Sequence, residues 1–174
     1  EEVRLTLWQT ALILLGPGLL VMASTRRLPW TMAAFGGGML VWAIAIGNGV
    51  GNRTLWVGVM FLLDPLNAAA GAPSIMNDWW AGRWGRTVSL MIGGAACGFC
   101  WEFWNYWAVA KWTYHLPFLG PLQEPSYFEM PWVGFQGFLP FAVECWVMLN
   151  TILVVLGGLG LRLAEPLPDE DAVL

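Results

Sequence analysis

Long apolar runs constrain this chain more than any other feature, because each is about as long as a bilayer is thick. A membrane-spanning helix needs about 20 mostly apolar residues. The sequence contains five such runs, at 5–24, 29–50, 54–72, 88–112 and 141–161. Charged residues make up only 11% of the chain, against about 25% in soluble domains. This pattern excludes a water-soluble enzyme, a disordered tail, a coiled coil and a nucleic-acid-binding protein.

We therefore expect an all-α protein, a polytopic transmembrane helical bundle with five spans in one domain over residues 1–163. An acidic polar tail follows at 164–174. Residues 73–86, which are rich in Trp, predict an interfacial segment, and residues 113–140 an outer loop that re-enters the membrane. Pro140 divides the last apolar stretch, and a sixth span there is the alternative.

The distribution of positive charge predicts the orientation, since cytoplasmic loops carry more Lys and Arg. With five spans, one side holds Arg26, Arg27, Arg83, Arg86 and Arg162, and the other holds Arg4, Arg53 and Lys111. The side with five positive charges is therefore predicted to be cytoplasmic, which places the N-terminus outside and the C-terminus in the cytoplasm.

The fourth run carries a helix face that alternates small and polar residues. Steps of three and four bring Gly94, Gly98, Glu102, Asn105 and Tyr106 onto one side. The first two form a G-x-x-x-G pair, which predicts contact with another helix. A carboxyl at this depth costs about 2.5–3.5 kcal/mol unless it is paired, protonated or hydrated, so it is a candidate functional group.

Two further acids extend this hypothesis. Glu144 lies in the last span and Glu129 where the chain re-enters the membrane, so both are expected in the outer half with Glu102. Convergence of the three carboxyls would form one site. The alternative is structural, with each acid accepting hydrogen bonds from indoles or backbone N–H groups. Asp64 and Asn67 mark a polar break in the third span, and we interpret them as structural, with the acid capping a helix restart after Pro65.

Metal, haem and redox chemistry are not favoured. Cys97 and Cys100 match the C-x-x-C spelling, but they fall inside an apolar run instead of at an accessible helix N-terminus. His115 is the only histidine, and no set of three or four zinc ligands is visible. We predict no metal site and no cofactor.

Several motifs resemble those of a group of uncharacterised bacterial multispan membrane proteins, a resemblance that brings no activity with it. The motifs lie at 64–67, 101–105, 128–131 and 134–138. The resemblance implies a multi-pass protein of the bacterial inner (plasma) membrane.

A second similarity is to the transmembrane lycopene cyclase domain and related carotenoid-processing proteins. It covers 101–144, through a Trp-acid pair at 101–102, Trp-x-Tyr at 112–114 and an acid before Pro131. The paired Glu-Glu of that family is absent, which puts the catalytic set in doubt. This similarity implies protonation of an isoprenoid double bond, with Glu102 as acid and Glu144 or Glu129 as base. Cation–π faces and orienting groups would come from Trp101, Trp104, Trp107, Asn105 and Tyr106.

Two functions from different classes follow. The first is a non-enzymatic subunit of a larger membrane assembly, with other membrane proteins as partners and Trp-rich faces that contact lipid, quinone or pigment. The second is a cofactor-free membrane enzyme that acts on an isoprenoid or carotenoid. The small size and incomplete catalytic set favour the subunit, whereas the polar face around Glu102 favours the enzyme.

Overall fold

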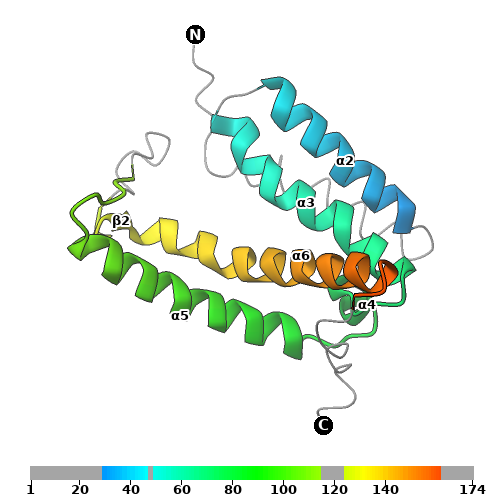
Figure 1. The fold of residues 1–174 in the computed structure, drawn as a ribbon. Helices are drawn as coiled ribbons and strands as arrows, with labels where there is room; N and C mark the ends of the chain where they lie inside the picture. Colours follow the sequence, from blue (N-terminus) through cyan, green and yellow to red (C-terminus); the bar gives the residue numbers. More distant parts are fainter. Residues whose placement is uncertain (1–28, 47–48, 115–123, 162–174) are drawn as a thin grey trace.

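The structure is a computed structural model that describes residues 29–46, 49–114 and 124–161 of the 174-residue chain. The predicted span at 5–24, the tail at 164–174 and His115 lie outside these residues. Helices dominate the described part, as predicted (Figure 1). In chain order they are α2 (Pro29–Ile46), α3 (Gly49–Ala69), α4 (Ile75–Trp80), α5 (Gly85–Trp107), the 3₁₀ helix η2 (Trp132–Gly137) and α6 (Phe138–Gly158).

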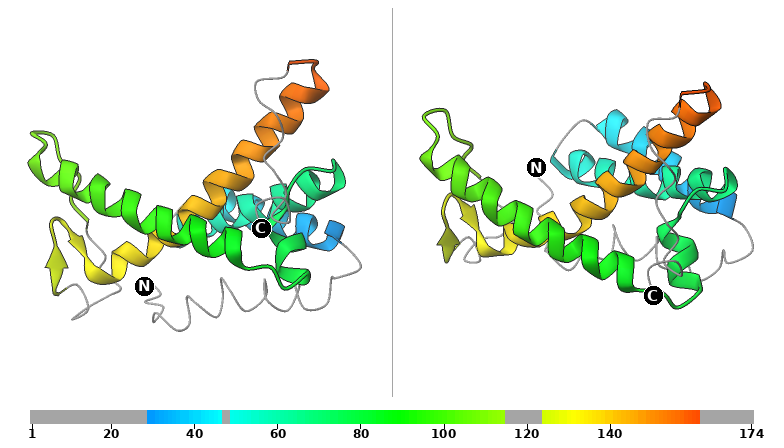
Figure 2. Two further views of the ribbon diagram at one scale, coloured as in Figure 1. Left: turned by 90° about the horizontal axis from the view of Figure 1, so that it is seen from below. Right: turned by 60° about the horizontal axis from the view of Figure 1, so that its bottom comes forward.

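α6 occupies the centre of the arrangement. It packs against α3 on one side and α5 on the other, while α2 lies antiparallel along α3 (Figure 1). α5 and α6 run in opposite directions, cross near the start of α6 and then diverge (Figure 2). A short antiparallel hairpin, β1 (Ser126–Tyr127) and β2 (Met130–Pro131), precedes η2. Its turn residue Phe128 packs on the rings of Phe99, Phe103 and Tyr106 of α5.

One helical stretch in the described ranges is long and apolar enough to cross a membrane, the 27 residues Trp132–Gly158. Two others, Trp30–Ala45 and Leu55–Ala69, are apolar but shorter. The prediction of five spans is therefore not supported by the described helices. Polar residues interrupt two of the predicted spans. The first turns of α3 contain Asn52 and Arg53, and α5 carries Arg86, Glu102 and Asn105 among its apolar residues.

The helix ends differ from the predicted boundaries by three to five residues in most places, and two differences bear on the candidate residues. α3 continues through Pro65 to Ala69, so the expected break at this proline is wrong, and the helix does not restart there. α5 ends at Trp107 instead of near residue 112, because Ala108 takes an extended conformation and the chain turns back. Pro140 lies in the first turn of α6. Backbone N–H groups in a first turn have no acceptor within their helix, so the missing N–H of proline costs no helical hydrogen bond.

Glycine sets the closest approach of α5 to α6, which confirms the G-x-x-x-G prediction. A Cβ on Gly94 would meet the Phe138 carbonyl oxygen and the Ala142 methyl, and one on Gly98 would meet the Phe138 ring. Gly36 is equally tight against the α3 backbone at Gly58. Small residues let helix backbones approach this closely and gain packing contacts.

We expect Gly94→Ala to lower the free energy of unfolding by about 1–3 kcal/mol, because the added methyl meets backbone that cannot move aside. Gly93→Ala is the matched control on the same helix: no atom lies within 4 Å of its Cβ position, so stability should hold or rise by up to about 1 kcal/mol. Denaturant unfolding in detergent micelles measures both. Equal effects of the two substitutions would contradict the observed contact.

Candidate functional site

In the described ranges many polar side chains are buried beside two apolar clusters, while many large apolar side chains are exposed. The buried polar set is Asp64, Asn67, Ser74, Asp78, Thr87, Glu102, Asn105, Glu144 and Asn150. On α5 the buried residues are Thr87, Gly94, Gly98, Glu102 and Asn105. The exposed residues on the same helix include Val88, Ile92, Phe99, Trp101 and Trp104. Any candidate site must therefore be sought among the buried polar groups.

Asp64 fastens the short helix α4 to α3. Its carboxylate accepts hydrogen bonds from the Ser74 hydroxyl at 2.6 Å, the Ile75 N–H at 2.9 Å and the Met76 N–H at 3.1 Å. The last two donors are first-turn N–H groups of α4, which have no partner within their own helix. Asp64 thus caps α4, not a restart of its own helix as the sequence predicted. This corrects its role while leaving it structural.

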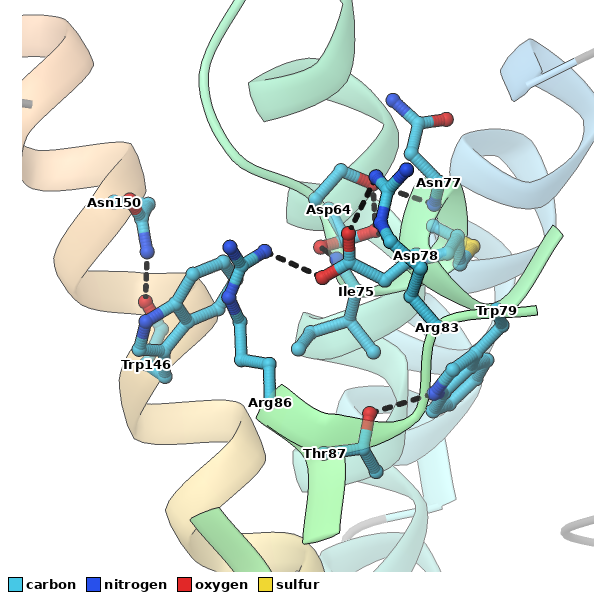
Figure 3. Close-up of polar contacts among 12 residues, drawn as sticks. Asp64, Ile75, Asn77, Asp78, Trp79, Arg83, Arg86, Thr87, Trp146 and Asn150 are labelled. Atoms are coloured by element: carbon cyan, nitrogen blue, oxygen red, sulfur yellow. Dashed lines mark hydrogen bonds and ion pairs between the residues drawn. The ribbon is translucent and has the colours of Figure 1, made fainter. Parts of the chain in front are cut away.

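A second buried acid, Asp78, holds two arginines (Figure 3). One carboxylate oxygen pairs with Arg83 at 2.9 Å and the other with Arg86. The Arg86 guanidinium also lies 4.9 Å from the centre of the Trp146 ring of α6. Trp79 donates its indole N–H to the Thr87 hydroxyl at 2.7 Å (Figure 3). The segment predicted to be interfacial is therefore tied to α5 and α6 by charged and aromatic contacts.

Asn67 joins α3 to α6 by two hydrogen bonds. Its amide donates to the Val147 carbonyl at 3.0 Å, and its carbonyl oxygen accepts from the Thr151 hydroxyl at 2.9 Å. Asn150 donates to the Trp146 carbonyl of its own helix at 2.8 Å. The end of the molecule around α4 is thus a structural region, in which neither amide has a buried oxygen or nitrogen without a partner among the described residues.

The C-terminal end of α5 carries a different arrangement, centred on Glu102. This residue is 0% exposed, and its Oε1 accepts a hydrogen bond of 2.5 Å from the Tyr114 hydroxyl. Its Oε2 is buried with no hydrogen-bond partner in the described part of the chain. Burial and the bond to Glu102 raise the pKa of Tyr114 to about 12. The sequence predicts Tyr106 as the phenol that orients Glu102. In the structure this phenol is Tyr114, the last residue of the motif 112–114.

The chain after α5 folds back along the helix as a return loop, residues 108–114. Asn105 fixes it by donating to the Trp112 carbonyl at 2.9 Å and accepting from the Trp112 N–H at 2.7 Å. Lys111 reaches the hairpin and pairs with Glu129 at 2.6 Å. This bond raises the pKa of Lys111. Asn105 therefore positions the backbone of the return loop at Trp112. Both of these hydrogen bonds go to Trp112 and not to Glu102, which the sequence predicts it to orient.

The predicted aromatic residues lie on the outside. Trp101, Trp104 and Trp107 are 53%, 67% and 70% exposed. Tyr106 is also exposed and lies 5.3 Å from the Lys111 ammonium. Trp112 of the return loop and Trp132 after the hairpin are exposed as well, and we refer to these five exposed rings together as the aromatic surface. It offers rings to lipid, a partner or a ligand, and does not line an interior chamber.

The three candidate acids do not meet. Glu129 pairs with Lys111, and Glu102 bonds Tyr114. Glu144 is buried in α6, and its Oε2 has no hydrogen-bond partner among the described residues. Because Gly98 faces Phe138 and the helices are antiparallel, Glu102 and Glu144 lie in opposite directions from this contact. At about 1.5 Å per residue they are about 15 Å apart along the helices. The predicted convergence is therefore wrong.

No group of three His, Cys, Asp or Glu residues in the described ranges could hold a metal ion. Cys97, Cys100 and Cys145 are free thiols. Sequence reasoning missed Asp78 and Arg86 as a buried pair, although the spacing of one acid and two arginines within nine residues offered a signal.

No protein-family model, curated protein or solved structure matches this chain. The similarities noted in the motifs at 101–105 and 128–131 stay predictions from the sequence.

We expect Asp64→Ala to destabilise the protein by about 3 kcal/mol or more, since it leaves three donors without their acceptor. Asn77→Ala changes an exposed side chain in the same short helix and should shift stability by less than about 0.5 kcal/mol. Thermal unfolding of the two purified variants, followed by circular dichroism, gives the comparison. An Asp64→Ala protein as stable as Asn77→Ala would show that the cap contributes little.

Tyr114 should ionise about 2 pH units above the usual tyrosine pKa of about 10. Its pKa is raised on folding, so the stabilisation is present below pH 10 and is lost as pH rises from about 10 to about 12. Ultraviolet titration of phenolate absorbance, with Tyr114→Phe subtracted, measures this step. A difference spectrum with a midpoint near pH 10 would contradict the buried hydrogen bond.

Proposed function

We propose that the protein is a multi-pass integral membrane subunit, whose exposed apolar side chains contact lipid and partner proteins. The observation that carries this proposal is the sorting on α5, with Gly, Glu and Asn buried and tryptophans exposed. Exposing so many large rings to water would be costly, whereas in lipid it costs nothing, and the polar groups gain by facing inward. The apolar 27-residue stretch Trp132–Gly158 supports the same location.

The positions of tryptophan along α5 support a span for this helix too. Trp84 and Trp107 stand at its two ends, about 35 Å apart along the axis, against about 30 Å of hydrocarbon. Tryptophan favours the interfaces at this spacing. Arg83 and Arg86 lie at one end and Lys111 at the other, so few charges fall between them. We infer that α5 and α6 cross as an antiparallel pair, with Arg86 on the cytoplasmic side.

The aromatic surface is the proposed contact region. Large rings desolvate well and dominate the energetics of interfaces. Five exposed tryptophans at the outer end of α5 and beside the hairpin exceed what interfacial anchoring of one helix requires. We infer that this surface meets another subunit, a lipid, a quinone or a pigment in the bacterial inner membrane.

A second candidate function is a membrane enzyme that uses Glu102 as a general acid. The specific observation in its favour is the fully buried carboxyl with one oxygen bonded to a phenol and the other without a partner. Against it, neither Glu129 nor Glu144 lies beside Glu102 as a base. In this case Glu102→Gln would abolish a lipid conversion without lowering expression.

Gentle detergent extraction followed by native mass spectrometry tests the subunit proposal. We expect the protein to stay in membranes washed with alkaline carbonate and to be recovered with partners in a fixed ratio. Trp104→Ala with Trp107→Ala should weaken that association at least about tenfold, because buried tryptophans are frequent energetic centres of interfaces. Trp30→Ala is the matched control, since Trp30 is similarly exposed on α2.

Release of the chain by carbonate would contradict a membrane-embedded protein. Recovery of a single chain free of partners, unchanged by the double tryptophan substitution, would contradict the subunit role.

A further inference from the structure

Glu102 and Glu144 are the buried acids that each leave one carboxyl oxygen without a hydrogen-bond partner in the described ranges, and Glu102 is the one that lies beside the return loop. Asp64, Asp78 and Asn105 each use both of their side-chain polar atoms in hydrogen bonds or ion pairs. Glu102 is more deeply buried than Asn105 but satisfies only Oε1. A buried carboxyl oxygen without a partner is expensive, so a residue that only locked helices together would have both oxygens bonded.

We propose that Glu102 Oε2 accepts a hydrogen bond from the hydroxyl group of an uncharged lipid-soluble molecule held at the aromatic surface. This inference rests on the proposed membrane location and on the proposed contact role of that surface. It adds the chemistry of the group recognised, and it names the atom that recognises it.

The chemistry of the first oxygen favours a hydroxyl donor for the second. Oε1 already accepts from a phenol, the Tyr114 hydroxyl, at 2.5 Å. The geometry of the site is therefore suited to a neutral O–H donor. An ammonium group would have to lose its hydration to reach a fully buried atom, and this costs several kcal/mol unless its charge is paired and its other protons are bonded. A neutral hydroxyl avoids that cost.

The position of Glu102 suits the head of a molecule whose body lies in the bilayer. The residue precedes the end of α5 by five positions, about 8 Å along the helix. This places it just below the level of Trp107. Trp101 precedes Glu102 in the chain, lies about 100° from it around the helix, and is exposed, so it offers a ring to an apolar or aromatic body. A hydroxyl at Glu102 and a body against Trp101 would occupy both features together.

Access to Glu102 depends on the return loop, which covers this end of α5. Its residues 108–113 are all exposed, and only Tyr114 is partly buried. Among the described residues its hydrogen bonds and ion pair are the two bonds of Asn105, the bond of Tyr114 to Glu102, and the pair of Lys111 with Glu129. A segment with few buried apolar contacts opens at low free-energy cost, so a ligand can reach Oε2 without unfolding the helices.

The test is a titration of the full-length protein in phosphatidylcholine nanodiscs, read by native mass spectrometry. Dodecylhydroquinone and dioctanoylglycerol supply a phenolic and an aliphatic hydroxyl, respectively. The dimethyl ether of the hydroquinone has the same body without a donor. We expect at least one hydroxyl probe to bind at least about tenfold more tightly than the ether, since the ether leaves Oε2 unpaired.

Three variants connect the selectivity to Glu102. Glu102→Gln keeps the shape but has one acceptor oxygen, already used by Tyr114, so the preference for hydroxyl over ether should fall below about threefold. Glu124→Gln is the matched control, an exposed acid just before the hairpin that does not hold the return loop, and should keep the preference. Glu102→Asp keeps the carboxylate but withdraws it by one methylene, so the preference should fall here too. This second variant covers the case in which Glu102→Gln fails to fold.

Selectivity for dodecylhydroquinone alone identifies an aromatic hydroxyl as the donor, and selectivity for dioctanoylglycerol alone an aliphatic one. Each supports the site. Equal binding of hydroquinone and ether overturns the inference but leaves the aromatic surface as a contact region. Binding of none of the three probes overturns it too. Failure of the membrane proposal itself is recognised separately, by release of the chain with carbonate.

Discussion

Close contact between α5 and α6 at two glycines is the interaction on which the remaining arrangement depends. Gly94 and Gly98 bring the α5 backbone against Phe138 and Ala142, so the Phe138 ring and the Ala142 methyl pack directly on the α5 backbone where the two helices cross. The crossing fixes which face of α5 points inward, and residues at steps of four from these glycines are carried inside with them. Glu102 is buried for this reason, whereas Trp101 and Trp104 on either side are exposed.

The inward face of α5 could be predicted because helical periodicity needs no tertiary information. Gly94, Gly98, Glu102 and Asn105 are all buried, as the steps of three and four require. Tyr106 is also predicted to lie on this face, but it is exposed, because it lies about 100° from Asn105 around the helix. The start of α2 at Pro29 also follows from the sequence, since proline is suited to the first turn of a helix.

Contacts between distant segments could not be predicted. Nothing in the chain near Asp64 indicates that its carboxylate accepts from Ser74 and two backbone N–H groups of α4, because such capping depends on how the intervening turn closes. The expected meeting of Glu102, Glu129 and Glu144 assumed that acids at similar depth share one interior. The crossing of α5 with α6 instead sends Glu102 and Glu144 in opposite directions, and Lys111 takes up Glu129.

The two hydrogen bonds of Asn67 have a consequence for motion. They connect α3 to the Val147 carbonyl and the Thr151 hydroxyl of α6, while Asp64 connects α3 to α4. Sliding α6 by one turn would break both amide bonds at once, so α3, α4 and α6 must travel as one rigid body. α5 meets α6 through smooth glycine surfaces at the crossing, where rotation breaks no side-chain hydrogen bond. The first turn of α5 is held to the α4 segment by the Asp78–Arg86 pair and the Trp79–Thr87 hydrogen bond, so any change of shape is expected in the part of α5 beyond Gly98.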